Sequence, residues 1–201
     1  MLNRSWLLVL LTGLLFSCTS SRIATYPDSW AEPEPVSQDG CADLSGRYEN
    51  RAIDAPDNEN AQRHQTHPRF LSEFLVARLL VNGYKHKWIT TVRFARSGEE
   101  NLSVDYFKQD KIIFSDTLEK NGDFSCTPDG VVFESSYTKI YEVGGGVGKR
   151  VTRLIFFKAR DGSLMLTEAF SEKGIASVFL PIPFSDKKVS RYRFPAVEAN
   201  P

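Results

Sequence analysis

The chain has 201 residues with 25 basic and 25 acidic side chains, so its formal net charge at pH 7 is zero. A neutral chain without a basic run argues against nucleic acid or a strongly anionic surface as the main partner. It contains no serine nucleophile elbow and no matched set of metal ligands, so we expect a protein that is not an enzyme and has no cofactor or metal.

The N-terminus has the layout of a secretory signal peptide. Arg4 precedes an apolar run from Trp6 to Phe16, which is far shorter than the roughly 20 residues that a membrane-spanning helix needs. Leu15-Phe16-Ser17-Cys18 resembles the lipobox of bacterial lipoproteins. The resemblance implies that residues 1–17 are removed and that Cys18 carries a diacylglyceryl group, which holds the mature chain on a membrane. The alternative is an ordinary signal peptide with a chance cysteine.

The residues after Cys18 predict a location and a tether. Position 19 is Thr, whereas an Asp there resembles an inner-membrane retention signal, so for a Gram-negative host we expect an outer-membrane lipoprotein of the cell envelope facing the periplasm. Residues 18–40 contain Pro27, Pro33 and Pro35 and few apolar side chains. This composition predicts a flexible tether.

The two remaining cysteines, Cys41 and Cys126, are an even pair. In an oxidising compartment such a pair most often forms a disulfide. The bridge would tie the start of the folded domain to its middle. Two free buried thiols are the alternative. A metal site is disfavoured because neither cysteine has a second one at ligand spacing.

A short strand is expected over 44–49, followed by a polar stretch and then a helix over 68–81. In that helix Phe70, Leu71, Phe74, Leu75 and Leu79 form one apolar stripe at helical spacing. We expect the stripe to belong to the core, with a partner site as the alternative.

From Trp88 the apolar period drops to two, which is typical of strands. Trp88, Thr90, Val92 and Phe94 share one face, and Leu102, Val104 and Tyr106 lie opposite them. Later strands are expected over 111–118, 131–143, 150–159, 163–170, 175–182 and 189–194, with turns at Asn121-Gly122 and Asp161-Gly162. We therefore expect residues 41–194 to form a single β-rich domain and residues 195–201 to form a tail.

The predicted architecture is a mainly β, antiparallel up-and-down meander or barrel of about eight or nine strands, with one helix between the first two. Gly46-Arg47-Tyr48 stands where the lipocalins carry Gly-x-Trp, so the chain resembles lipocalin-like barrels. The resemblance implies the architecture and no particular ligand.

One predicted hairpin gives a candidate site. An even loop centred on Asp161-Gly162 places Arg153 and Glu168 as diagonal neighbours on the apolar face of the hairpin. Buried charges must pair or reach water. The two residues therefore form either a structural ion pair or the polar anchor of a ligand cavity.

Two other motifs are interpreted as structural. Gly144 to Lys149 imitates a phosphate loop, but Arg150 stands where Ser or Thr would bind magnesium, so we expect a flexible hairpin loop. His64, His67 and His86 lack a matched carboxylate, and we expect no metal there.

Two hypotheses of function follow. The favoured one is a membrane-anchored lipoprotein with a structural or docking role toward an envelope protein. The other is a binding module for a small apolar or amphipathic ligand. A large cavity would favour the second, and an exposed apolar patch the first. The segment from Ile175 to Phe184 is the candidate patch, with a place in the core as the alternative.

Overall fold

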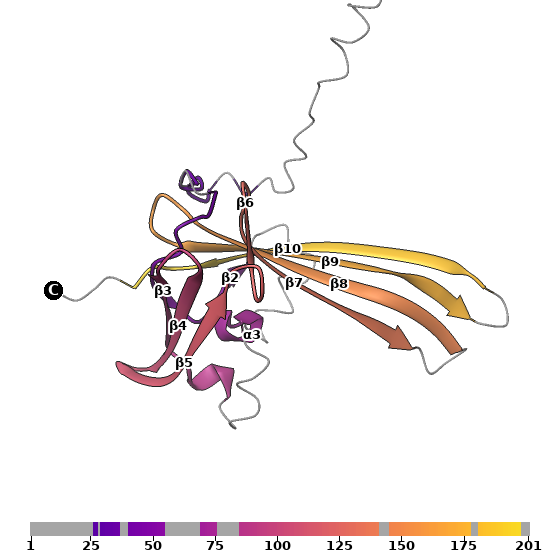
Figure 1. Ribbon diagram of the computed structural model, residues 1–201, viewed down its shortest axis with the longest axis horizontal. Helices are drawn as coiled ribbons and strands as arrows, with labels where there is room; N and C mark the ends of the chain where they lie inside the picture. Colours follow the sequence, from indigo (N-terminus) through magenta and orange to yellow (C-terminus); the bar gives the residue numbers. More distant parts are fainter. Residues whose placement is uncertain are drawn as a thin grey trace, which may run out of the picture.

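The computed structural model describes residues 26–27, 29–36, 40–54, 69–75, 85–140, 145–177 and 181–197. The strands in these ranges form two antiparallel sheets, one of four strands and one of six (Figure 1). Among the described residues no helix is both long enough and apolar enough to cross a bilayer. Cys18 and the predicted signal peptide lie outside the described residues.

The four-stranded sheet has the order β1-β3-β4-β5. Its strands are β1 (Gly46–Glu49), β3 (Thr91–Ser97), β4 (Asn101–Lys108) and β5 (Lys111–Glu119). Val92 lies opposite Tyr106 and Phe94 opposite Val104, so the predicted apolar face of this meander is confirmed. The prediction for Trp88 is wrong, because this residue ends the short 3-10 helix η2 (His86–Trp88) and is exposed.

The six-stranded sheet has the order β2-β10-β9-β8-β7-β6. Its strands are β2 (Ile53–Asp54), β6 (Ser125–Thr127), β7 (Gly130–Ile140), β8 (Gly145–Lys158), β9 (Leu164–Ser177) and β10 (Pro183–Phe194). The strands predicted separately over 163–170 and 175–182 are largely one long strand, β9. The polar residues around Lys173-Gly174 look like a turn in the sequence, but the ladder to β8 and β10 runs through them.

The predicted mainly β antiparallel meander is confirmed, whereas its closure into a lipocalin-like barrel is wrong. The described strands divide into two sheets, because consecutive β5 and β6 belong to different ones. The predicted helix is represented by α3 (Leu71–Leu75), which precedes β3, while residues 76–81 lie outside the described ranges. Leu71 is fully buried, so this part of the predicted apolar stripe belongs to the core.

An aromatic-rich core joins the two sheets. Its largest fully buried side chains are Tyr48, Tyr106, Tyr192, Phe94, Phe156, Phe194, Leu44, Leu71, Leu164 and Leu166. Phe156 of the second sheet packs against Phe94 of the first, with ring centroids 6.4 Å apart. We use the name body for the part of the molecule in which the two sheets share this core.

Part of the predicted tether is packed on the body. The Tyr26 ring contacts Phe157 at 4.9 Å between centroids, and its hydroxyl shares a 2.5 Å hydrogen bond with Thr167. Further along, the Glu34 N–H donates to the carbonyl of Lys158 at 2.8 Å. The expectation of a flexible tether is therefore wrong for these residues. Aromatic side chains at positions 26 and 30 cover an apolar patch on the outer face of the second sheet.

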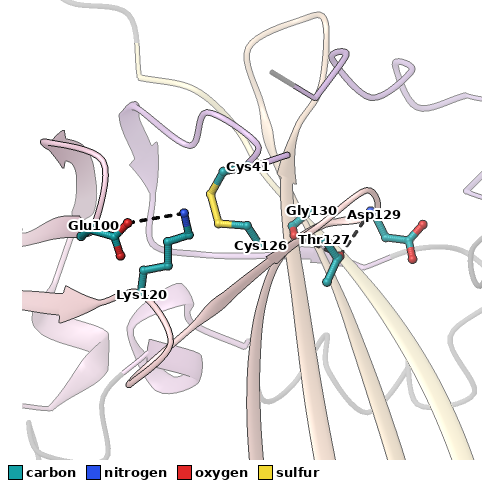
Figure 2. Close-up of a disulfide and its surroundings, with 7 residues drawn as sticks. All are labelled: Cys41, Glu100, Lys120, Cys126, Thr127, Asp129 and Gly130. Atoms are coloured by element: carbon teal, nitrogen blue, oxygen red, sulfur yellow. Dashed lines mark hydrogen bonds and ion pairs between the residues drawn. A yellow bond between two sulfur atoms is a disulfide. The ribbon is translucent and has the colours of Figure 1, made fainter. Parts of the chain in front are cut away.

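The predicted disulfide is present between Cys41 and Cys126, whose Cα atoms lie 4.8 Å apart (Figure 2). It joins the segment before β1 to strand β6, which lies at one edge of the second sheet. The bridge therefore ties the start of the folded domain to its middle, as the cysteine pair predicted.

Candidate functional site

The long strands β7 to β10 extend well past the first sheet and form a four-stranded projection (Figure 1). We call the outer parts of these strands, residues 134–140, 145–153, 168–177 and 183–190, the extension. Its strands stay hydrogen-bonded in register, with Tyr137 opposite Arg150 and Arg150 opposite Glu172. The strands of the extension remain paired although they lie beyond the hydrophobic core of the body. Because the core does not cover these strands, we treat the extension as the candidate functional site.

The predicted pairing of Arg153 with Glu168 is wrong. Glu168 lies opposite Leu154 and Arg153 opposite Ala169, so the two side chains lie on opposite faces of the sheet. Arg153 instead binds Glu134 through Nε at 3.0 Å and Nη2 at 2.9 Å, with both side chains 48% exposed. Such a surface ion pair contributes little to stability. Both interpretations of the pair, as a structural ion pair and as a ligand anchor, are therefore excluded.

The cause of this error is the length of one loop. Lys158 pairs with Leu164, and the Ala159 N–H donates to the Ser163 carbonyl at 2.8 Å. The loop therefore contains three residues, 160–162, with Gly162 at a φ of 80°. A three-residue loop closed by a left-handed glycine shifts the register by one compared with an even loop, and a one-residue shift moves side chains to the other face.

Glu168 has partners in the body. The Tyr192 hydroxyl donates to its Oε2 at 3.2 Å, and Arg69 Nη2 lies 3.7 Å from its Oε1. Burial, and to a smaller extent this carboxylate, raise the pKa of the Tyr192 hydroxyl. Glu168 therefore connects β9 to β10 and to the segment before α3, where the core ends.

One face of the extension carries an ion pair in an aromatic setting. Arg150 Nη2 donates to Glu172 Oε2 at 2.6 Å, and Arg150 Nη1 donates to the Tyr137 hydroxyl at 2.9 Å. The Arg150 guanidinium lies 4.7 Å from the centroid of the Phe170 ring. Glu172 is buried, although its neighbours Ser171 and Lys173 are half-buried and exposed, respectively. Removing Arg150 would leave this carboxylate without its cation, which is costly, so the cluster holds the middle of the extension together.

The glycines on this same face let the strands approach closely. A Cβ on Gly174 would lie 2.3 Å from the Val147 carbonyl oxygen, and one on Gly146 would lie 2.4 Å from that of Ile175. Gly146 to Lys149 therefore belong to strand β8, and the expectation of a flexible hairpin loop over 144–149 is wrong from residue 145 onward. Glycine within a strand marks such a close backbone approach.

The opposite face of the extension is arranged in rows. Ile140, Val147, Ile175 and Pro183 lie opposite one another across β7, β8, β9 and β10 at the outer end. We call them the tip row. Ile175 and Ile182 are exposed, so these members of the predicted apolar patch are on the surface, while residues 178–180 lie outside the described ranges.

The body offers little space for a ligand beside the disulfide. A pocket of about 20 Å³ is lined by Cys41, Leu44, Leu102, Phe124 and Val131 among others. That volume holds about one water molecule, far below the roughly 300 Å³ at which small-molecule sites begin. Buried tyrosines fill the interior between the sheets, and burial raises the pKa of both Tyr48 and Tyr106.

The histidines do not form a metal site within the described part of the chain. His86 Nδ1 lies 3.0 Å from Ser72 Oγ, while His64 and His67 lie outside the described ranges. No group of three or more potential metal-binding side chains occurs among the described residues.

No protein-family model, curated protein or solved structure matches the chain. The candidate site therefore depends on the geometry alone. Sequence reasoning found Ile175 to Phe184 but missed Ile140 and Val147. These residues join the tip row only through strand register, which periodicity does not specify between strands.

Proposed function

We propose that this chain is a membrane-anchored cell-envelope lipoprotein with a non-enzymatic structural or docking role. In this proposal Cys18 carries the lipid, and the extension is the docking surface. The anchor is proposed on the lipobox-like residues Leu15 to Cys18, and the outer-membrane location on the absence of Asp at position 19.

The observation that carries the docking role is the exposure of apolar side chains on a regular, ladder-bonded sheet. The extension and its outer end expose six large apolar side chains, which are Tyr137, Ile140, Val147, Ile175, Ile182 and Val189. Three of them, Ile140, Val147 and Ile175, are neighbours in the tip row on one face, and such a cluster of exposed apolar side chains marks an interaction site. The solvent-exposed face of an antiparallel sheet usually carries polar side chains.

The alternative function, binding of a small ligand, was predicted to depend on Arg153 and Glu168 acting together. These two residues lie on opposite faces of the sheet, so they do not form one binding site. The small pocket beside Cys41 lends this alternative no support either.

The anchor is tested by metabolic labelling with palmitate. We expect the wild-type chain to incorporate label and Cys18→Ser to incorporate none. The matched control replaces both Cys41 and Cys126 by Ser, and it should keep the label because these cysteines are joined in the disulfide. Equal labelling of wild type and Cys18→Ser would contradict the proposal.

The docking role is tested by acylating lysines with a membrane-permeant reagent in intact cells and in the purified chain. Lys149, Lys173 and Lys187 of the extension are exposed, as are Lys87 and Lys111 of the body. We expect the extension lysines to be labelled at least threefold less in cells than in the purified chain, and the body lysines to be labelled equally in both. Equal labelling of both groups would mean that the extension is not covered.

A further inference from the structure

The outer end of the extension is apolar on one face. There the tip row exposes Ile140 by 75%, Val147 by 44% and Ile175 by 40%. Ile182, which directly precedes β10, is 53% exposed. Residues at the free end of a hairpin are usually polar, so this end is chemically unusual.

Lysines lie directly behind the tip row. Lys149 lies opposite Lys173 in the next row of the same face, between Thr138 and Ser185. The row after that ends in Lys187. Two residues along a strand span about 7 Å, so Lys149 and Lys173 follow the tip row at that distance and Lys187 follows at about twice that distance.

Lys149 and Lys173 lie directly opposite each other on neighbouring strands, and both are exposed. Like charges directly across two strands are destabilising. In the described part of the chain, the first carboxylate inward on this face is Glu134, and it is paired with Arg153. An anion from outside would relieve the repulsion between Lys149 and Lys173.

We propose that the outer end of the extension binds a bilayer surface of anionic phospholipid. The tip row enters among the acyl chains, Lys149 and Lys173 lie at the level of the headgroup phosphates, and Lys187 lies one row farther from the bilayer centre. This inference rests on the proposed function in that it names the partner of the same docking surface. It does not depend on acylation of Cys18.

The direction of the layering favours a bilayer over a protein. Protein interfaces have an apolar centre surrounded by a polar rim. Here apolar and cationic rows succeed each other along the strands. The same order is met along the bilayer normal, where apolar groups enter about 5–10 Å and lysines reach the phosphates.

The net charge of the whole chain is zero, so it gives no indication of this group of lysines. Lys149, Lys173 and Lys187 are far apart in the sequence and form no basic run, so the sequence argued against an anionic surface as the main partner. The sheet register brings them to one place. A second copy paired through the edge of β10 is a poorer occupant, because Lys187 and Lys188 belong to the outer part of this strand, which β2 does not cover, and edge lysines oppose strand pairing.

The test measures vesicle binding to the full chain immobilised through a C-terminal tag, since β10 ends in the body, away from the tip row (Figure 1). Vesicles contain phosphatidylcholine alone or with about 30% phosphatidylglycerol. The apolar N-terminal segment is the same in every variant, so only differences between variants and between lipids are compared. We expect at least tenfold tighter binding of the anionic vesicles.

The first variant, Lys149→Gln with Lys173→Gln, should weaken anionic binding about 25-fold, because each lysine near such a surface contributes about fivefold. Its melting temperature should stay equal or rise, because a like-charge pair is removed. The matched control, Lys87→Gln with Lys111→Gln in the body, should bind like wild type. Equal loss in the two variants would overturn the proposal.

The second variant, Ile140→Thr with Ile175→Thr, keeps β-branched residues in the strands and should weaken binding about tenfold. Ile53→Thr with Ile112→Thr is the control, because both isoleucines are similarly exposed on the body. Binding that depends on the lysines but not on Ile140 and Ile175 would overturn insertion and indicate electrostatic adsorption to the headgroups alone. Equal binding of neutral and anionic vesicles would also overturn the proposal. Palmitate labelling reports separately on the anchor.

Discussion

Strands β8 and β9 pass through two environments without a break in their ladder. At their inner ends, Phe156 and Leu166 lie opposite each other and are fully buried between the sheets. At their outer ends, Val147 and Ile175 also lie opposite each other, but both are exposed. The same ladder of paired residues contains both pairs, so the difference in exposure lies in what the side chains contact. The inner ends hold the fold, and the outer ends are free to contact something else.

The largest expected effect comes from removing a core side chain of the body. Phe156→Ala should lower the free energy of unfolding by about 3–5 kcal/mol, because it leaves a cavity between the sheets. The exposed counterpart Val147→Ala should change it by no more than about 0.5 kcal/mol. Denaturant unfolding of both variants measures the contrast. Similar losses would show that the extension has a core of its own.

The disulfide should stabilise the body next most strongly. Cys41 and Cys126 are separated by 85 positions, and closing a long loop restricts the unfolded chain. Replacing both by Ser should lower the free energy of unfolding by about 2–4 kcal/mol. Thermal unfolding with and without reductant provides the measurement. If the reduced wild-type chain unfolds at the same temperature as the oxidised one, the bridge does not stabilise the body.

We expect alkaline pH to lower the free energy of unfolding, because Tyr26 ionises. Burial raises the pKa of its hydroxyl from 10.0 to about 12. Below pH 10 the hydroxyl is protonated in both states, so its contribution is fully present. As the pH rises from 10 to 12, the unfolded chain ionises first and roughly 2–3 kcal/mol is lost. Tyr26→Phe keeps the ring and should show a shallower alkaline loss of melting temperature, whereas an identical profile would place Tyr26 in solvent.

The smallest expected effect is local to the extension. Gly174→Ala should cost about 1–3 kcal/mol, because the new Cβ would meet the Val147 carbonyl oxygen at 2.3 Å. Gly122→Ala is the control, since its nearest neighbour would be 3.7 Å away. Amide exchange over 145–153 should quicken in the first variant only. Unchanged exchange there would show that β8 and β9 have room for the methyl group.

Sequence reasoning succeeded where one strand or one turn decided the structure. The alternation of Val92 and Phe94 identified the buried face of β3, and an even cysteine pair identified the disulfide. It failed where two distant segments had to be aligned. One extra residue in the loop at Gly162 reversed the face of Arg153 relative to Glu168, and strand continuity past Gly174 depends on the backbone of β8.

The candidate site was predictable only in part for the same reason. An apolar run near Ile175 is visible in the sequence. The lysines behind it become neighbours only through the pairing of β8 with β9 and β10. A surface built from single residues of several strands leaves no local pattern.

Hydrogen exchange of the full chain, alone and with anionic vesicles, tests the division between body and extension most directly. Alone, we expect amides of 146–153 to exchange much faster than those of 154–158 on the same strand, because only the latter lie over the core. With vesicles, exchange over 146–153 should slow while that over 154–158 stays unchanged. Uniform protection along β8, or slowing confined to the body, would contradict the account.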